Sequence, residues 1–166
     1  MSVCLMYLCG MKILMVCLGN ICRSPIAEGV LQFKANAAGL NWQVDSAGTN
    51  GFHNGEAPHP LSQKISLQNG IDISSQRSRK LTREDFHRYD LLYAMAGDVL
   101  EDMKDIGSND FDPKKAILFL EALYPGQHKD VPDPWYGNED GYIRTFDLIN
   151  RTCDAIIEKY LKQNGK

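Results

Sequence analysis

The stretch Met15–Pro25, MVCLGNICRSP, carries two cysteines, an asparagine, an arginine and a serine within eleven residues. The apolar run Lys12–Cys17, which overlaps its start, is typical of a short buried parallel strand. Ser24–Ala38, which begins at its end, predicts a helix, because Ser24 can cap the first turn, a proline suits that turn and good helix formers follow. The stretch is therefore expected to be the turn between a buried strand and a helix.

Strands and helices alternate along the rest of the chain. Further strands are expected over Trp42–Asp45, Tyr89–Met95 and Ala116–Leu120, and helices over His59–Asn69 and Asp98–Ile106, with a capping-box-like start at Thr82 and Asp85. The last helix has one apolar face, made by Phe146, Ile149, Cys153, Ile156 and Tyr160. The alternation predicts an α/β fold: a single domain with a four-stranded parallel sheet flanked by helices on both faces, in a flavodoxin-like, three-layer arrangement.

Composition narrows the class of protein. The 166 residues suit one domain with a real hydrophobic core. The net charge of −3 provides no basic surface of the kind that binds nucleic acid or an anionic membrane. No apolar run approaches the ~20 residues that span a bilayer. Any anion is therefore expected to bind at a local site, and a monomer is the default expectation.

The cysteines and histidines do not resemble a disulfide or metal scaffold. The cysteines are odd in number and irregularly spaced, which favours reduced thiols in a cytoplasm over a secreted framework: Cys4, Cys9, Cys17, Cys22 and Cys153. None of the four histidines forms a pair with metal-ligand spacing. We therefore expect neither a metal site nor a cofactor.

Residues 1–10 are expected to lie outside the domain. The segment MSVCLMYLCG is apolar, but it lacks a basic start and is too short for a full signal peptide. The sequence MKILMV follows it at once and looks like a natural start. We therefore predict an N-terminal extension without a catalytic role over residues 1–10, and one domain over residues 11–166.

The opening stretch has the chemistry of an oxyanion site. Cys17 and Arg23 form a C-x5-R pattern, which alone fits a buried cysteine beside a surface arginine equally well. Its position is more specific, because open α/β sheets bind ligands at the carboxyl ends of strands and helix N-termini bind phosphate. Arg23 can contact two phosphate oxygens, and Gly19 permits unusual backbone angles. The same field favours Cys17 as a thiolate nucleophile that accepts a hydrogen bond from Ser24.

Attack on a phosphate ester also needs an acid for the leaving oxygen. Asp133 is the candidate, within the long Pro- and Gly-rich loop 124–141. An Asp between prolines is most often a turn residue. Here Trp135 and Tyr136 follow it, and two aromatic side chains on such a loop would expose apolar surface unless they line a pocket or pack on the domain. The loop is therefore expected to place Asp133 over the strand ends.

Three motifs in this order, VCLGNICRSP, DSAGT and PDPWYG, resemble the low-molecular-weight protein tyrosine phosphatase family over residues 11 to about 161. The resemblance implies Cys17 as nucleophile, Arg23 as phosphate ligand and Asp133 as general acid. It implies hydrolysis of phosphotyrosine without a metal: Cys17 attacks phosphorus while Asp133 protonates the phenolate. Water activated by Asp133 then releases inorganic phosphate from a cysteinyl-phosphate.

The same resemblance assigns supporting roles. The phosphate-binding loop would comprise Leu18, Gly19, Asn20, Ile21, Cys22, Arg23 and Ser24. Within it, Asn20 and Ser46 would form bracing hydrogen bonds, and Ser24 would help to hold the thiolate. The substrate pocket would be formed by Leu18, Phe52 and Trp135, with Tyr136 as either wall or core.

A deep aromatic slot favours phosphotyrosine, because phosphoserine is too short to reach the sulfur at its floor. The expected partner is a phosphotyrosine-containing protein, with a tyrosine kinase among the candidates. The expected product is inorganic phosphate.

Several neighbouring side chains allow more than one interpretation. Cys22 is either a small apolar residue under the loop or, as the resemblance supports, a redox guard that forms a disulfide with oxidised Cys17. His53 is expected to be a solvated loop histidine, and the run QRSRK a solvated surface or salt-bridge partner. Cys153 is expected in the core. Ala96 stands where many members of the family carry an acidic residue.

Three alternatives stay open. Thioredoxin-coupled arsenate reductases share the loop and fold but need further cysteines, and none lies between Arg23 and Thr152. Protein arginine phosphatases tend to carry Thr where Ile21 stands, so Ile21 favours phosphotyrosine. A non-catalytic phosphate-binding module needs neither nucleophile nor acid, so the joint presence of Cys17 and Asp133 argues against it.

Overall fold

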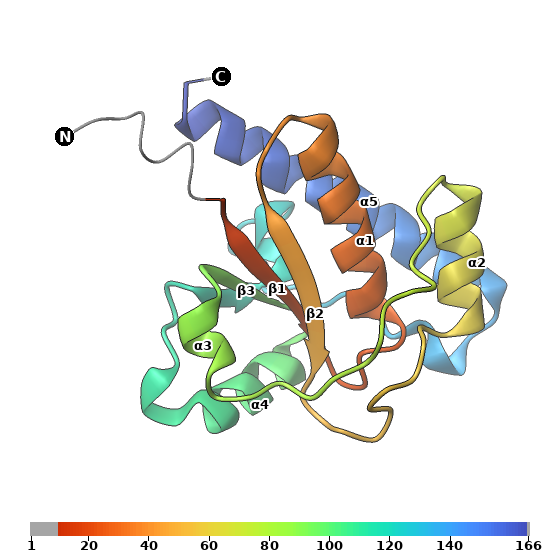
Figure 1. The fold of residues 1–166 in the computed structure, drawn as a ribbon, viewed down its shortest axis with the longest axis horizontal. Helices are drawn as coiled ribbons and strands as arrows, with labels where there is room; N and C mark the ends of the chain where they lie inside the picture. Colours follow the sequence, from red (N-terminus) through yellow and green to blue (C-terminus); the bar gives the residue numbers. More distant parts are fainter. Residues whose placement is uncertain (1–9, 166) are drawn as a thin grey trace.

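A four-stranded parallel sheet forms the centre of the computed structural model, which describes residues 10–165 (Figure 1). The strands lie in the order β2 (Gln43–Gly48), β1 (Lys12–Cys17), β3 (Leu91–Ala94) and β4 (Ala116–Leu118). The predicted α/β fold with four parallel strands is confirmed. Of the expected extension over residues 1–10, residues 1–9 lie outside the described residues.

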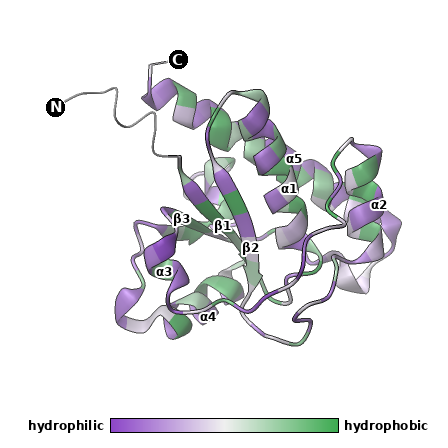
Figure 2. Cartoon of the chain, in the orientation of Figure 1, coloured by the Kyte–Doolittle hydropathy of each residue, from purple (hydrophilic) through white to green (hydrophobic). Residues whose placement is uncertain are grey.

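Helices cover both faces of the sheet (Figure 1). One face carries α1 (Arg23–Ala37), α2 (Pro60–Gln68) and α5 (Glu139–Gln163), which pack on one another, and the other carries α3 (Asp85–Arg88) and α4 (Gly97–Gly107). Figure 2 shows β1 as mostly hydrophobic, whereas hydrophilic and hydrophobic residues alternate along α1 and α5. Each helix therefore buries one stripe, and the central strand buries both faces.

The side chains of β1 divide between two apolar cores. Ile13 and Met15 belong to the core under α1 and α5, and Leu14 and Val16 belong to the core under α4. All four are fully buried. Because alternate side chains of a strand point to opposite faces, this short run anchors both helical layers at once.

The bounds of some elements differ from the predicted ones. β2 continues to Gly48, beyond Asp45, because its end pairs with the end of β1, where Cys17 and Gly48 are partners. β4 ends at Leu118, and the next residues form a 3₁₀ turn. His59 is not inside α2: it precedes the helix, and its Nδ1 accepts the Leu61 N–H at 3.2 Å.

The predicted helix starts were partly wrong. Ser24 does not cap α1: the residue before the helix is Cys22, whose side chain makes no capping bond, and Ser24 lies in the first turn. The amides at the start of α1 are therefore left for an external acceptor, which suits an anion site. At α3, the Asp85 carboxylate accepts the Thr82 N–H at 2.8 Å, as in a capping box, but Thr82 does not cap in return.

The end of β2 lies very close to the turn after β1. A Cβ added at Gly48 would lie 2.7 Å from the Leu18 carbonyl oxygen. The Thr49 N–H then donates to the Cys17 carbonyl at 3.0 Å. Glycine at this position therefore allows two strand ends and the turn between β1 and α1 to meet at one edge of the sheet. Among residues 10–165, no helix is long and apolar enough to cross a membrane.

Replacing Ile149 by Ala should destabilise the protein by about 2–5 kcal/mol, because the fully buried side chain would leave a cavity in the core between α5 and the sheet. Ile143→Ala on the same helix is the control: this side chain is 47% exposed, and its loss should cost less than about 1 kcal/mol. Urea denaturation measures both. Equal losses for the two variants would contradict the described packing of α5.

Candidate active site

Residues 17–24, here called the phosphate loop, connect β1 to α1 at the carboxyl edge of the sheet. The backbone turns left-handed at Asn20, with φ of 56°. Gly19 has no positive φ, so the prediction that this glycine provides the unusual angle was wrong. Its small size serves another purpose, since an added Cβ would lie 3.1 Å from Cδ2 of His53. An asparagine tolerates the left-handed region better than most residues because its short amide can bond locally.

Cys17 lies at the floor of the loop with its sulfur turned toward the start of α1. The side chain is 3% exposed, and its Sγ is 2.9 Å from Ser24 Oγ. The Asn20 side-chain amide donates to Ser24 Oγ at 2.9 Å. Because that oxygen already accepts from Asn20, the Ser24 hydroxyl hydrogen is free to point at the sulfur. The arrangement can therefore stabilise a thiolate.

Arg23 connects the phosphate loop to the segment that carries Asp133. The arginine is 5% exposed, and its Nη1 donates to the Val131 carbonyl at 3.1 Å. Its Nη2 lies 3.5 Å from Asp133 Oδ2, while Oδ1 of the same carboxylate accepts the Trp135 N–H at 3.0 Å. The predicted acid therefore lies beside the predicted phosphate ligand, although 110 positions separate them in the chain.

The segment before Asp133 is fastened to the ends of β3 and α4. The Val131 N–H donates to the Met95 carbonyl at 2.8 Å, and Asp130 Oδ1 accepts the Gly97 N–H at 2.8 Å. Asp130 thus supplies an acidic group at the start of α4, next to Ala96, the position at which many members of the family carry an acidic residue. These contacts fix the height of Asp133 above the sheet edge.

A cavity of about 280 Å³ opens above the phosphate loop. Its lining includes Cys17, Arg23 and Asp133 together with Leu18, Phe52, Trp135 and Tyr136, so the predicted pocket residues lie around the predicted nucleophile. Phe52 and Tyr136 are 85% and 92% exposed, so they form the rim, whereas Trp135 at 45% belongs to the wall. The cavity can therefore admit a flat aromatic group.

His53 also lines this cavity, so of the two interpretations open from the sequence, a solvated loop histidine or a substrate contact beside Phe52, the structure leaves both available. The His53 ring lies 5.8 Å from that of Trp135, and its Nδ1 bonds to Glu56 at 2.9 Å. The side chain stays 29% exposed, as expected for a loop histidine, while the loop after β2 folds back over Gly19 and turns it toward the cavity. The only sequence signal was its place next to Phe52. In residues 10–165, no group of three His, Cys, Asp or Glu side chains is arranged to hold a metal ion.

Cys22 lines the same cavity as Cys17 and contacts α5 on its other side. Its Sγ is 3.5 Å from the hydroxyl of Tyr142 on α5, and burial raises the pKa of its thiol to about 12. The ring of His59 stacks on Tyr142, with centroids 5.0 Å apart. Cys22 is therefore held as a neutral thiol between the cavity and Tyr142, which is compatible with both of its predicted roles.

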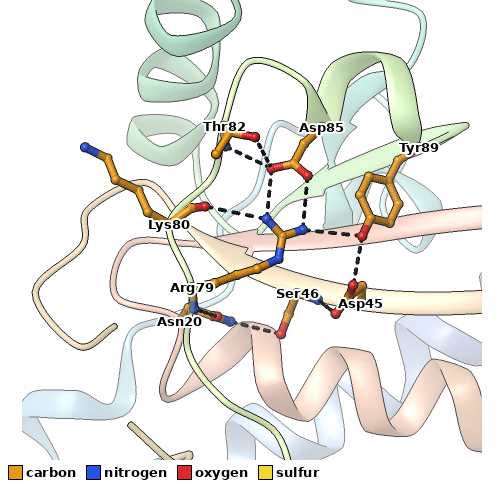
Figure 3. Close-up of polar contacts among 8 residues, drawn as sticks. All are labelled: Asn20, Asp45, Ser46, Arg79, Lys80, Thr82, Asp85 and Tyr89. Carbon is orange, nitrogen blue, oxygen red and sulfur yellow. Dashed lines mark hydrogen bonds and ion pairs between the residues drawn. The ribbon is translucent and has the colours of Figure 1, made fainter. Parts of the chain in front are cut away.

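The segment after α2 supports the phosphate loop from outside. The Arg79 N–H donates to Asn20 Oδ1 at 3.0 Å, and Ser78 Oγ donates to the Gly19 carbonyl at 3.1 Å. Figure 3 shows the Arg79 guanidinium between Asp85 and Tyr89. The two Arg79–Asp85 bonds measure 2.9 and 3.1 Å. The predicted salt-bridge role of the QRSRK run is therefore present, with its backbone holding the loop as well.

Asp45 and Ser46 extend this support to β2 (Figure 3). The Tyr89 hydroxyl donates to Asp45 Oδ2 at 2.8 Å, and the other oxygen of Asp45 accepts the Ser46 N–H at 3.1 Å. Ser46 Oγ in turn accepts from the Asn20 amide at 2.9 Å. Asn20 is thus held by Ser24, Ser46 and Arg79, which come from three different segments.

Comparison with known proteins agrees with this geometry. The family model for the low molecular weight phosphotyrosine protein phosphatase matches residues 12–166. A low molecular weight phosphotyrosine protein phosphatase of Schizosaccharomyces pombe is 38% identical over 157 residues, which cover 89% of this chain and 97% of that protein.

Two solved structures share the fold closely. Vibrio vulnificus Wzb in complex with benzylphosphonate superimposes with a TM-score of 0.81 at 29% identity, over 90% of this chain and 98% of that one. A mutant of the Bacillus subtilis YwlE arginine phosphatase, with a phosphorylated active-site serine, gives a TM-score of 0.83 at 30% identity, over 92% of this chain and 96% of that one. Because the family model matches residues 12–166, the chain belongs to the low molecular weight phosphotyrosine protein phosphatase family.

Proposed function

We propose that this chain hydrolyses phosphotyrosine in proteins through a cysteinyl-phosphate intermediate. Cys17 is the nucleophile, Arg23 holds the phosphate, and Asp133 is first the general acid and then the general base. The observation that carries the proposal is that one aromatic-walled cavity brings these three side chains together from the phosphate loop and the loop before α5.

In the first step the Cys17 thiolate attacks phosphorus in line with the ester oxygen. The bond from phosphorus to that oxygen breaks, and protonated Asp133 gives its proton to the leaving phenolate. The free amides of the loop and the Arg23 guanidinium hold the three remaining phosphate oxygens. The Trp135 N–H keeps one Asp133 oxygen fixed, which leaves the other to face the cavity.

In the second step a water molecule attacks the cysteinyl-phosphate. Asp133, now ionised, takes a proton from this water, and the sulfur leaves as a thiolate that the Ser24 hydroxyl stabilises. Inorganic phosphate is released and the starting state returns. Every step uses side chains of this chain and water.

The aromatic wall supports an aryl phosphate as substrate. Benzylphosphonate, bound by the related Wzb, has an aromatic ring one carbon from phosphorus. The arginine phosphatase YwlE makes phosphoarginine the second candidate. Ile21, an apolar lining residue of the cavity, favours the aromatic ester over the charged guanidinium. Phosphotyrosine proteins, a tyrosine kinase among them, are the proposed partners.

We also infer a reducing compartment, the cytoplasm. Cys17, Cys22 and Cys153 are free thiols in the structure. The reducing systems of the cytoplasm keep protein thiols in this free state. The thiolate chemistry proposed for Cys17 depends on that state.

Cys17→Ser should abolish turnover of p-nitrophenyl phosphate, and Asp133→Ala should lower kcat by about 10²–10⁴-fold, the usual contribution of a general acid. Assays at mildly acidic pH with EDTA present measure both variants against the unmodified chain. A Cys17→Ser protein that is folded and still turns over would sink the cysteinyl-phosphate mechanism. Full activity of Asp133→Ala would remove only its acid role.

Trp135→Ala should raise KM for a phosphotyrosine peptide by about tenfold, because the substrate's aromatic ring loses its contact with the indole that forms the cavity wall. Inhibition by inorganic phosphate, which does not contact that wall, should stay unchanged. Phe33→Ala is the control, since Phe33 is an exposed aromatic residue on α1 outside the cavity. Initial rates on phosphotyrosine, phosphoserine and phosphoarginine peptides complete the test. A faster rate on phosphoarginine would favour the second candidate.

Hydrogen peroxide should inactivate the enzyme, and a thiol reductant should restore it. Peroxide converts the Cys17 thiolate to a sulfenic acid, and the Cys22 thiol then displaces water to give a Cys17–Cys22 disulfide. Because the pKa of Cys22 is raised to about 12, iodoacetamide at neutral pH should label Cys17 and leave Cys22 unlabelled. If the Cys22→Ser variant regains as much activity after peroxide and reductant as the unmodified chain, Cys22 has only a packing role.

A further inference from the structure

Glu28 is a largely buried carboxyl group behind the phosphate loop that the proposed chemistry does not use. It lies on α1, one turn after Ser24, and its Oε2 is 2.5 Å from Ser46 Oγ on β2. Burial raises the pKa of Glu28 to about 7. A partly buried carboxyl group is costly unless its hydrogen bonds are satisfied, so its bond to Ser46 requires an explanation.

The hydrogen atoms around Ser46 have one consistent arrangement. The Asn20 side-chain nitrogen carries hydrogens only, so Ser46 Oγ accepts from it at 2.9 Å. The amide cannot turn over without loss, because Asn20 Oδ1 accepts the Arg79 N–H. The single hydroxyl hydrogen of Ser46 is therefore directed at Glu28, which acts as its acceptor.

The same constraint reaches the nucleophile. The second hydrogen of the Asn20 amide goes to Ser24 Oγ, which leaves the Ser24 hydroxyl hydrogen for the Cys17 sulfur, each over 2.9 Å. Among residues 10–165, the polar side chains bonded to Ser46 Oγ are Asn20 and Glu28. Without an acceptor at position 28, the Ser46 hydroxyl would compete for the Asn20 oxygen and turn the amide away from Ser24.

We propose that Glu28 is a positioning residue of this phosphatase: by accepting the Ser46 hydrogen, it fixes the Asn20 amide and, through Ser24, the hydrogen bond to Cys17. This inference rests on the proposed role of Cys17 as nucleophile. Glu28 itself touches neither the cavity nor the reacting atoms.

Both protonation states of Glu28 can accept this hydrogen. The neutral acid does so through its carbonyl oxygen, and the carboxylate does so more strongly. The charged groups that act on its ionisation are Asp45 on β2, which favours the proton, and Arg79 before α3, which disfavours it. The chain of hydrogen bonds from Glu28 through Ser46, Asn20 and Ser24 to Cys17 is here called the relay. Its Ser46–Glu28 hydrogen bond should strengthen as the pH rises through about 7.

Two substitutions at position 28 distinguish the effect of losing the hydrogen-bond acceptor from the effect of changing the size of the side chain. Glu28→Gln keeps an acceptor oxygen and removes the ionisation. Glu28→Met keeps the length and helix preference but removes the acceptor. Ser46→Ala breaks the relay at the next member, and Glu158→Met, on the exposed side of α5, is the matched control for the exchange itself.

Glu28→Met should lower kcat on p-nitrophenyl phosphate about tenfold, the effect of one misplaced hydrogen bond, with KM changed less than about twofold. It should also raise the pH at which iodoacetamide alkylation of Cys17 reaches half its maximal rate. Ser46→Ala should do the same, and the double variant should be no slower than Ser46→Ala alone. Glu28→Gln should stay within about threefold of the unmodified chain.

Glu28→Met with a kcat and alkylation profile matching those of Glu28→Gln would overturn the proposal, as would losses that multiply in the double variant. Thermal unfolding checks that each variant folds. If Glu28→Met does not fold, Ser46→Ala decides: its kcat and its Cys17 alkylation profile should both differ from those of the unmodified chain, and unchanged values for both overturn the proposal. Alkylation needs no turnover, so a failure of the phosphatase mechanism itself shows separately, in Cys17→Ser.

Discussion

The carboxamide of Asn20 is the interaction on which the rest of the site depends. Its backbone is left-handed, with φ of 56°, so the phosphate loop can reverse direction within a few residues. Its side chain bonds to Ser24, Ser46 and Arg79, which belong to α1, β2 and the segment before α3. Three separate parts of the fold therefore meet at one amide. A side chain with two donors and one acceptor at this point orders the loop and also determines which hydroxyl hydrogen is left for Cys17.

The sheet makes this convergence possible because its strands are parallel. The ends of β1, β2 and β3 all lie at the same edge, so the loops that follow them approach one another without long connections. The Met95 carbonyl at the end of β3 accepts the Val131 N–H, which places Asp133 beside Arg23. The position of the acid thus follows from the same edge that forms the phosphate loop, although the acid lies far along the chain.

Much of this fold could be predicted, because apolar runs and helix periodicity are local signals. Lys12–Cys17 and the last helix were identified correctly on that basis. What failed depended on contacts between distant segments. The left-handed angle falls on Asn20, whose amide is held by Ser46 and by the Arg79 N–H, and both partners lie far along the chain. Glu28 on α1 gave only a faint signal, an acidic residue in an apolar stretch, since its partner Ser46 lies 18 positions away on β2.

The two cysteines of the phosphate loop have different hydrogen-bond partners, and the proposed chemistry follows from that difference. Cys17 faces the Ser24 hydroxyl and the free amides at the start of α1, so a negative charge on its sulfur has donors around it. Cys22, five residues later, faces Tyr142 and the apolar core, and its pKa is raised to about 12 by burial. A neutral thiol so close to a thiolate adds no repulsion in the resting enzyme. In the proposed redox role, Cys22 would react only once Cys17 is oxidised, because a sulfenic acid is electrophilic and can be attacked by a neighbouring thiol.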